Sequence, residues 1–165
     1  MNTSATTSAL DVAYWFMDKD TENNKLQHLL FLAQAHYAVN NDMQYFMPCV
    51  FVCDENGFFE PSVAKVAHLG KPLGIKENID KKADTFLAEI WDSYGKLSLS
   101  ELDNLIKNLP VYKKIYREGV KSIVQIKSIV ENFKPSSNMF DIEKKKVTFS
   151  QNGPVVVVPW KPRKI

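Results

Sequence analysis

Apolar residues recur along the first 133 residues at the spacing of helices that bury one face. The clearest pattern lies between residues 21 and 40, with Thr21 as the expected N-cap. Its buried stripe consists of Leu26, Leu29, Leu30, Ala33 and Tyr37. Further helices are expected over residues 8–17, 61–68, 79–94, 98–109, 111–118 and 120–133. The pattern therefore predicts six or seven helices.

Capping residues support several of these helix ends. Ser8 with Asp11 and Ser98 with Glu101 have the spacing of capping boxes. Gly95 stands where a left-handed residue commonly ends a helix, and Pro110 is expected to stop the helix before it.

Two regions have the character of β-strands instead. The run Cys49–Cys53 is followed by Asn56-Gly57, a strong turn pair, which predicts a short hairpin within residues 46–60. Residues 146–150 and 155–158 flank a second Asn-Gly pair and predict another hairpin near the C-terminus. The expected fold is mainly α (α+β): a compact bundle of six or seven helices with one or two short β-hairpins.

The C-terminal segment differs from the rest of the chain. We expect a helical domain over residues 1–133 and a basic β-hairpin extension over residues 134–165. Four consecutive valines, residues 155–158, indicate a strand that is covered on both faces. Either the core packs against both faces of this strand, or a partner packs against one of them. Val156, Val158 and Trp160 are therefore candidate partner-binding residues.

The composition is that of a globular domain, with 165 residues of which 45% are hydrophobic and 24% charged. The net charge is +2 overall, but residues 1–80 carry 5 Lys and 10 acidic residues. The basic half includes residues 134–165, with 7 Lys or Arg against 2 acidic residues. This asymmetry either steers a partner or is ordinary surface charge.

The sequence contains no recognised catalytic or cofactor motif, so we expect no enzyme, no cofactor and no metal. Cys49, Cys53, His36 and His68 form one pair and two scattered histidines, which is not a clustered zinc pattern. Cys53 and Cys49 are better explained as small buried residues. His28 and His36 lie roughly 80° apart around a helix and are not a facing pair.

The N-terminus lacks the basic start and apolar stretch of a signal peptide, and no apolar run is long enough to span a bilayer. We therefore expect a cytosolic protein with no membrane association.

The order of three motifs resembles the Panacea domain family, the SocA-like antitoxin domains. Residues 25–36 (KLQHLLFLAQAH) resemble its opening signature, and residues 56–63 and 86–98 resemble its next two conserved regions. The sequence departs from the family at His28, where lysine is usual, and at Phe58, where proline is usual. It also lacks the family's Thr-His pair within residues 104–107. Five residues match family positions with structural or interface roles: Gln27, His28, Gln34, Gly57 and Tyr94.

The resemblance implies a compact helical domain, often phage- or plasmid-associated, that neutralises a neighbouring toxin by binding it, in some cases as an adaptor for a protease. It implies no catalytic residues. The expected partner is a cognate toxin or another protein, including a second copy of the chain. The alternative is a nucleic-acid-binding accessory protein of a mobile element that uses the basic C-terminal tail.

Overall fold

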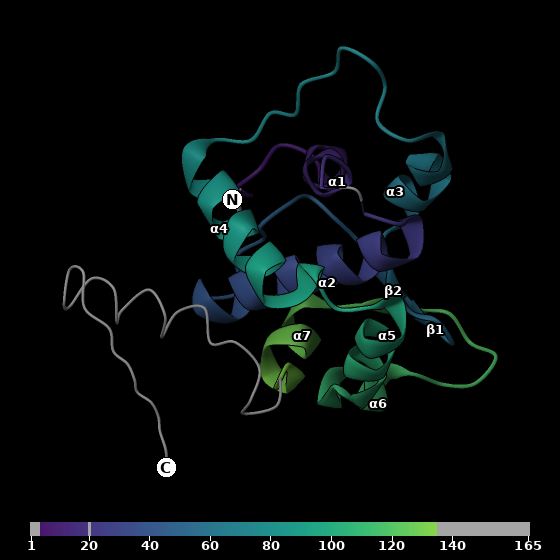
Figure 1. The fold of residues 1–165 in the computed structure, drawn as a ribbon. Coiled ribbons are helices and arrows are strands. Elements are labelled where there is room, and N and C mark those ends of the chain that lie inside the picture. Colours follow the sequence, from purple (N-terminus) through teal and green to yellow (C-terminus); the bar gives the residue numbers. More distant parts are fainter. Residues whose placement is uncertain (1–3, 20, 135–165) are drawn as a thin grey trace. The chain divides into compact units, whose positions relative to one another are not determined.

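The computed structural model describes residues 4–19 and 21–134 (Figure 1). The described chain is mainly α, with seven α-helices and one small antiparallel sheet. The C-terminal hairpin expected over residues 146–158, with Val156, Val158 and Trp160, lies outside the described residues.

The elements follow one another in the order that the hydrophobic pattern indicates, with one exception described below. In chain order they are α1 (Ala9–Met17), α2 (Asn23–Asn40), β1 (Phe51–Asp54), β2 (Gly57–Phe59), α3 (Pro61–Val66) with the 3₁₀ turn η1 (Ala67–Leu69), α4 (Lys81–Ile90) with the π-helical turn η2 (Trp91–Gly95), α5 (Leu99–Asn108), α6 (Pro110–Ile115), β3 (Ser122–Val124) and α7 (Ile126–Asn132). No helix among them has the length and apolar character needed to cross a bilayer.

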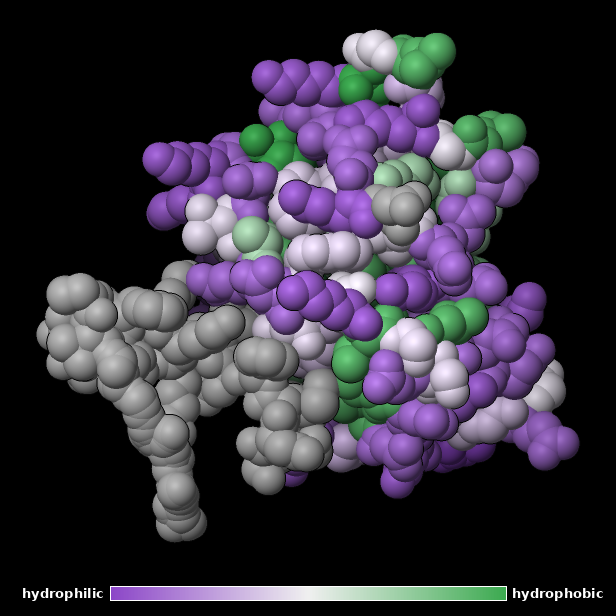
Figure 2. Space-filling model, viewed as in Figure 1, coloured by the Kyte–Doolittle hydropathy of each residue, from purple (hydrophilic) through white to green (hydrophobic). Residues whose placement is uncertain are grey.

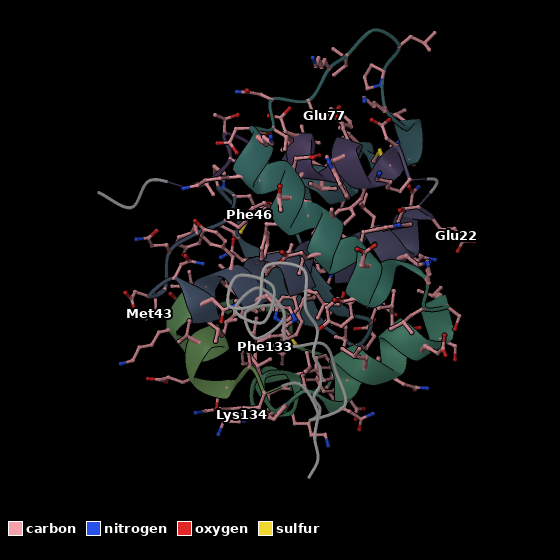
Figure 3. The ribbon with its side chains drawn as sticks, turned by 60° about the vertical axis from the view of Figure 1, so that its left-hand side comes forward. Glu22, Met43, Phe46, Glu77, Phe133 and Lys134 are labelled. Carbon is pink, nitrogen blue, oxygen red and sulfur yellow. The ribbon has the colours of Figure 1, made fainter. Side chains whose placement is uncertain are left out.

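Helix α2 is the centre of the fold. Figure 1 shows it crossing the molecule between α1, α3 and α4 on one side and α5, α6 and α7 on the other. Phe46 and Phe133, labelled in Figure 3, lie on opposite sides of α2 and pack against Tyr37 and His36 respectively. The predicted apolar stripe of α2 is buried except at Tyr37, which is half-buried. The polar residues His28, Gln34 and His36 of the same helix are buried as well.

The three strands form a sheet in the order β2-β1-β3, with both neighbours antiparallel to β1. The predicted hairpin is confirmed, although Glu55 and Asn56 occupy the turn and Gly57 pairs with Asp54. The inner face of the sheet packs on α2, where Phe31 stacks on Phe58 with ring centroids 4.0 Å apart.

The expected single helix over residues 120–133 is wrong. Ser122–Val124 instead form β3, which pairs with Phe51–Cys53, and only Ile126–Asn132 form a helix. The reason is tertiary: β1 offers an open edge, and two adjacent β-branched residues, Ile123 and Val124, suit a half-covered sheet better than a helix.

Helix ends agree with the sequence at α5 and differ at α1 and α2. The capping box of Ser98 and Glu101 is present. Ser8 caps α1 by accepting from the Leu10 N–H, but Asp11 accepts from Thr7 and Asn78 instead of completing a box.

Thr21 does not cap α2, because the N-cap is Glu22 and the Thr21 hydroxyl donates to the Phe16 carbonyl. The hydroxyl thereby ties the chain leaving α1 back onto the end of that helix.

Gly95 does not adopt a left-handed conformation. It lies in η2, and its φ is not among the positive values of the chain. A Cβ at this position would lie 2.3 Å from a ring carbon of Trp91. Glycine is therefore required by the close approach of the indole ring and not by backbone handedness.

Candidate functional site

A pocket of about 430 Å³ opens where the N-terminal half of α2, the β1–β2 hairpin and α5 meet. Its lining consists of Asn24, Gln27, His28, Asp54, Asn56, Gly57, Phe58, Phe59, Leu99, Asp103 and Lys107. This volume lies within the usual range for small-ligand pockets. We call it the α2–α5 pocket.

A side-chain hydrogen bond joins two helices at the wall of the α2–α5 pocket. His28 Nε2 lies 2.6 Å from Asp103 Oδ1, and the His28 side chain is 5% exposed while that of Asp103 is 39% exposed. Because an ionised carboxylate only accepts hydrogen bonds, the proton of the ring belongs on Nε2. His28 Nδ1 is buried and makes no hydrogen bond within the described chain.

Gly57 allows the hairpin to approach His28. Its φ is +123°, and a Cβ at this position would lie 3.2 Å from His28 Cε1 and 3.3 Å from Ile106 Cγ2. A side chain here would crowd the His28 ring and Ile106 and would strain the backbone. The candidate residues Gly57 and His28 are therefore adjacent in space as parts of one wall.

Asp54 is the second acid of the pocket. Its Oδ1 accepts from the Asn56 N–H at 2.8 Å, and its main-chain carbonyl accepts from the Tyr112 hydroxyl at 2.9 Å. Lys107 supplies the one ammonium group among the lining residues, and none of them carries a hydroxyl or thiol.

Gln27 fastens α2 to the end of the hairpin. Its Oε1 accepts from the Glu60 N–H at 2.8 Å, and its Nε2 donates to the Glu60 carbonyl at 3.5 Å. The side-chain amide therefore pairs with Glu60 as a neighbouring strand would, which fixes the edge strand β2 beside the pocket.

The other two candidate residues of the described chain, Gln34 and Tyr94, lie in the core and not in the pocket. Gln34 Oε1 accepts from the backbone N–H groups of Phe46 and Met47 at 3.0 and 3.3 Å. The Tyr94 hydroxyl lies 2.5 Å from His36 Nε2. Burial raises the pKa of Tyr94 well above the usual range of a tyrosine. The structure thus brings Gln27, His28 and Gly57 together and places Gln34 and Tyr94 elsewhere.

The sheet has an apolar outer face that the sequence pattern did not predict, in which Val52 and Phe59 are half-buried and the Lys121 ammonium lies 5.9 Å from the centre of the Phe59 ring. In the register of the three strands, Val52 lies directly between Phe59 and Ile123. Ile123 is 65% exposed and Val50, two residues before Val52 on the same face, is 51% exposed. We call Val50, Val52, Phe59 and Ile123 the outer sheet face. It escaped prediction because Ile123 was assigned to a helix.

A second exposed apolar feature is the loop between η1 and α4. Leu69, Leu73 and Ile75 are exposed there, and Figure 2 shows hydrophobic residues at the top of the view, where this loop lies in Figure 1. The base of the loop is fixed by Lys71, whose Nζ lies 2.6 Å from Asp18 and 2.7 Å from Glu77. These residues project singly and do not form a row.

The two cysteines are free thiols in poor positions for chemistry. Burial raises the pKa of Cys49 to about 12 and that of Cys53 to about 11, with Glu60 and Asp54 respectively adding to the effect. Both thiols are therefore protonated at neutral pH, and Cys53 packs as a small core residue. No cluster of three or more potential metal ligands occurs in the described residues.

Comparison of the chain with protein-family models, with curated proteins and with solved structures finds no match.

Proposed function

We propose that this chain is a protein-binding module that neutralises a cognate toxin by direct binding, the activity that the resemblance to the Panacea domains implies. The observation that supports it best is the outer sheet face. Three apolar side chains from three strands lie in one row there, and the most exposed of them, Ile123, is 65% exposed.

Such a row favours a partner for physical reasons. Single exposed apolar residues are ordinary, but a contiguous apolar sheet surface gains free energy when another molecule covers it. β3 is also an edge strand, so its outer backbone groups are open to pairing with an added strand.

The α2–α5 pocket extends this surface. Phe59 belongs to the outer sheet face and also lines the pocket, so the two features are contiguous. An apolar centre beside a polar hollow is the usual composition of a protein interface, with the polar groups supplying specificity. A toxin could be blocked by this contact alone, or carried by it to a protease as some Panacea domains do.

Growth rescue tests the proposal. The chain is co-expressed with the product of the neighbouring open reading frame, and the wild-type chain is expected to restore growth. Ile123→Lys is expected to abolish rescue, because it places a charge at the most exposed position of the apolar row. Leu73→Lys makes the same change on the distant loop and serves as the matched control, since Leu73 is fully exposed.

Two results would contradict the proposal. One is rescue by Ile123→Lys at the wild-type level. The other is binding of a generic oligonucleotide that weakens steeply with salt while no protein partner is bound, which would favour the nucleic-acid alternative.

A further inference from the structure

Two carboxylate oxygens of the α2–α5 pocket have no hydrogen-bond partner within the described chain. Asp103 Oδ1 is bound by His28, but its Oδ2 makes no hydrogen bond within the described chain. Asp54 Oδ1 accepts from Asn56, and its Oδ2 is likewise without a hydrogen bond there. Both residues line the same hollow.

One further polar atom of the wall has no partner. Nε2 of His28 is bound to Asp103, while its Nδ1 is buried beside Gly57 with no partner in residues 4–19 and 21–134. A buried polar atom without a partner costs free energy, which is unusual for a side chain with a structural role alone.

The charged residues that line the α2–α5 pocket indicate which charge a ligand would carry. Two carboxylates face one ammonium group, that of Lys107, and Lys107 is exposed and forms no ion pair within the described chain. The site therefore favours a cation that offers several N–H donors. A guanidinium group offers five in one plane, whereas an ammonium group is a single point with three.

We infer that the α2–α5 pocket accepts an arginine side chain of the partner protein, with Asp103 and Asp54 as its carboxylate ligands and His28 as the residue that positions Asp103. This inference rests on the proposed function, since it assigns the arginine to the protein that covers the adjoining outer sheet face. The volume of about 430 Å³ accommodates one long side chain.

The test uses the full chain and Nα-acetyl-L-arginine amide as the probe, with histidine-ring and backbone amide NMR signals as the readout. The probe is expected to shift the signals of His28, Gly57 and Asp103 saturably, with a Kd in the millimolar range for a single side chain removed from its protein. Nα-acetyl-L-citrulline amide has nearly the same shape without the charge and is expected to bind at least about tenfold more weakly.

Three variants sharpen the assignment. Asp103→Asn is expected to weaken binding by about tenfold, because the charge-assisted hydrogen bond is lost. Lys107→Gln is expected to strengthen binding about twofold to threefold, because a like charge is removed. Glu55→Gln makes the same change of charge as Asp103→Asn beside the pocket, where Glu55 is exposed and does not line it, and is expected to have little effect.

Circular dichroism establishes that each variant is folded, and Asp54→Asn provides a second route should Asp103→Asn unfold. The inference is overturned if the arginine probe gives no saturable shift, if the citrulline probe binds equally well, or if Glu55→Gln weakens binding as much as Asp103→Asn. Growth rescue in the previous experiment is independent of this probe. If the chain rescues growth but does not bind the arginine probe, the proposed function is supported and the assignment of an arginine to the pocket is wrong.

Discussion

Two histidines on the same helix, eight residues apart, have opposite surroundings. His28 pairs with Asp103, whose side chain is 39% exposed at the mouth of a pocket. His36 pairs with Tyr94, which is fully buried, and the ring of Phe133 lies 4.9 Å from the His36 ring. Eight residues correspond to about 12 Å along the helix axis, enough to pass from a polar hollow into the core.

The same contrast separates the five candidate residues of the sequence analysis into structural residues and pocket residues. Gln34 and Tyr94 satisfy polar groups that the core cannot expose to water, so their side chains hold the fold together. Gln27, His28 and Gly57 shape a wall that is open to a ligand. The sequence alone does not distinguish these roles, because all five residues lie within or beside helical and hairpin patterns that look alike in one dimension.

The largest expected effect is that of Gln34→Ala. It leaves the buried N–H groups of Phe46 and Met47 without an acceptor and opens a cavity, so the free energy of unfolding should fall by about 3 kcal/mol. Gln27→Ala removes the same kind of contacts at a half-exposed position and should cost about 1 kcal/mol. Urea denaturation of both variants measures the difference. Equal losses would contradict the division between core and pocket.

Tyr94→Phe should come next, with a loss of about 1–2 kcal/mol because the buried nitrogen of His36 loses a partner. Burial raises the pKa of Tyr94 above 10.0, so the folded chain keeps the phenol proton when the unfolded chain releases it. This stability is complete below pH 10 and is lost as the pH rises further.

Between pH 10 and the onset of alkaline unfolding, the Tyr94→Phe variant should consequently lose less stability than the wild type. Thermal denaturation of both proteins over a series of pH values measures the difference. Tyr14→Phe is the control, since Tyr14 is half-exposed and its hydroxyl makes no hydrogen bond within the described chain. An unchanged alkaline profile in Tyr94→Phe would show that the phenol does not carry this dependence.

The elements that the sequence predicts correctly are those specified by residues close together in the chain. The stripe of α2, the capping box at Ser98 and the hairpin around Gly57 depend on residues within a few positions of each other, and all three are present. β3 was missed because it forms only against β1, about 70 residues earlier in the chain. The pocket was missed for the same reason, since His28 and Asp103 are 75 residues apart.

Asp103→Ala should have a smaller effect than the core substitutions. It removes the only hydrogen bond of the His28 ring within the described chain, with an expected loss of about 1 kcal/mol. His28→Leu and the double variant complete a double-mutant cycle by chemical denaturation, in which a coupling free energy of about 0.5–1 kcal/mol is expected. A coupling energy of zero would show that the pair does not hold α2 and α5 together.

Ile123→Lys should change the free energy of unfolding least, by less than about 0.5 kcal/mol, because Ile123 is 65% exposed. Its effect is expected on binding instead. A variant that unfolds on this change would show that the outer sheet face is part of the core and not a recognition surface.

The affinity of the chain for the product of the neighbouring open reading frame, measured by titration calorimetry, tests the recognition surface most directly. The wild type and Leu73→Lys should bind with the same Kd, in the micromolar range or below, and Ile123→Lys should bind at least about tenfold more weakly. Equal affinities for all three proteins, or no binding by the wild type, would contradict the assignment of the outer sheet face to a protein partner.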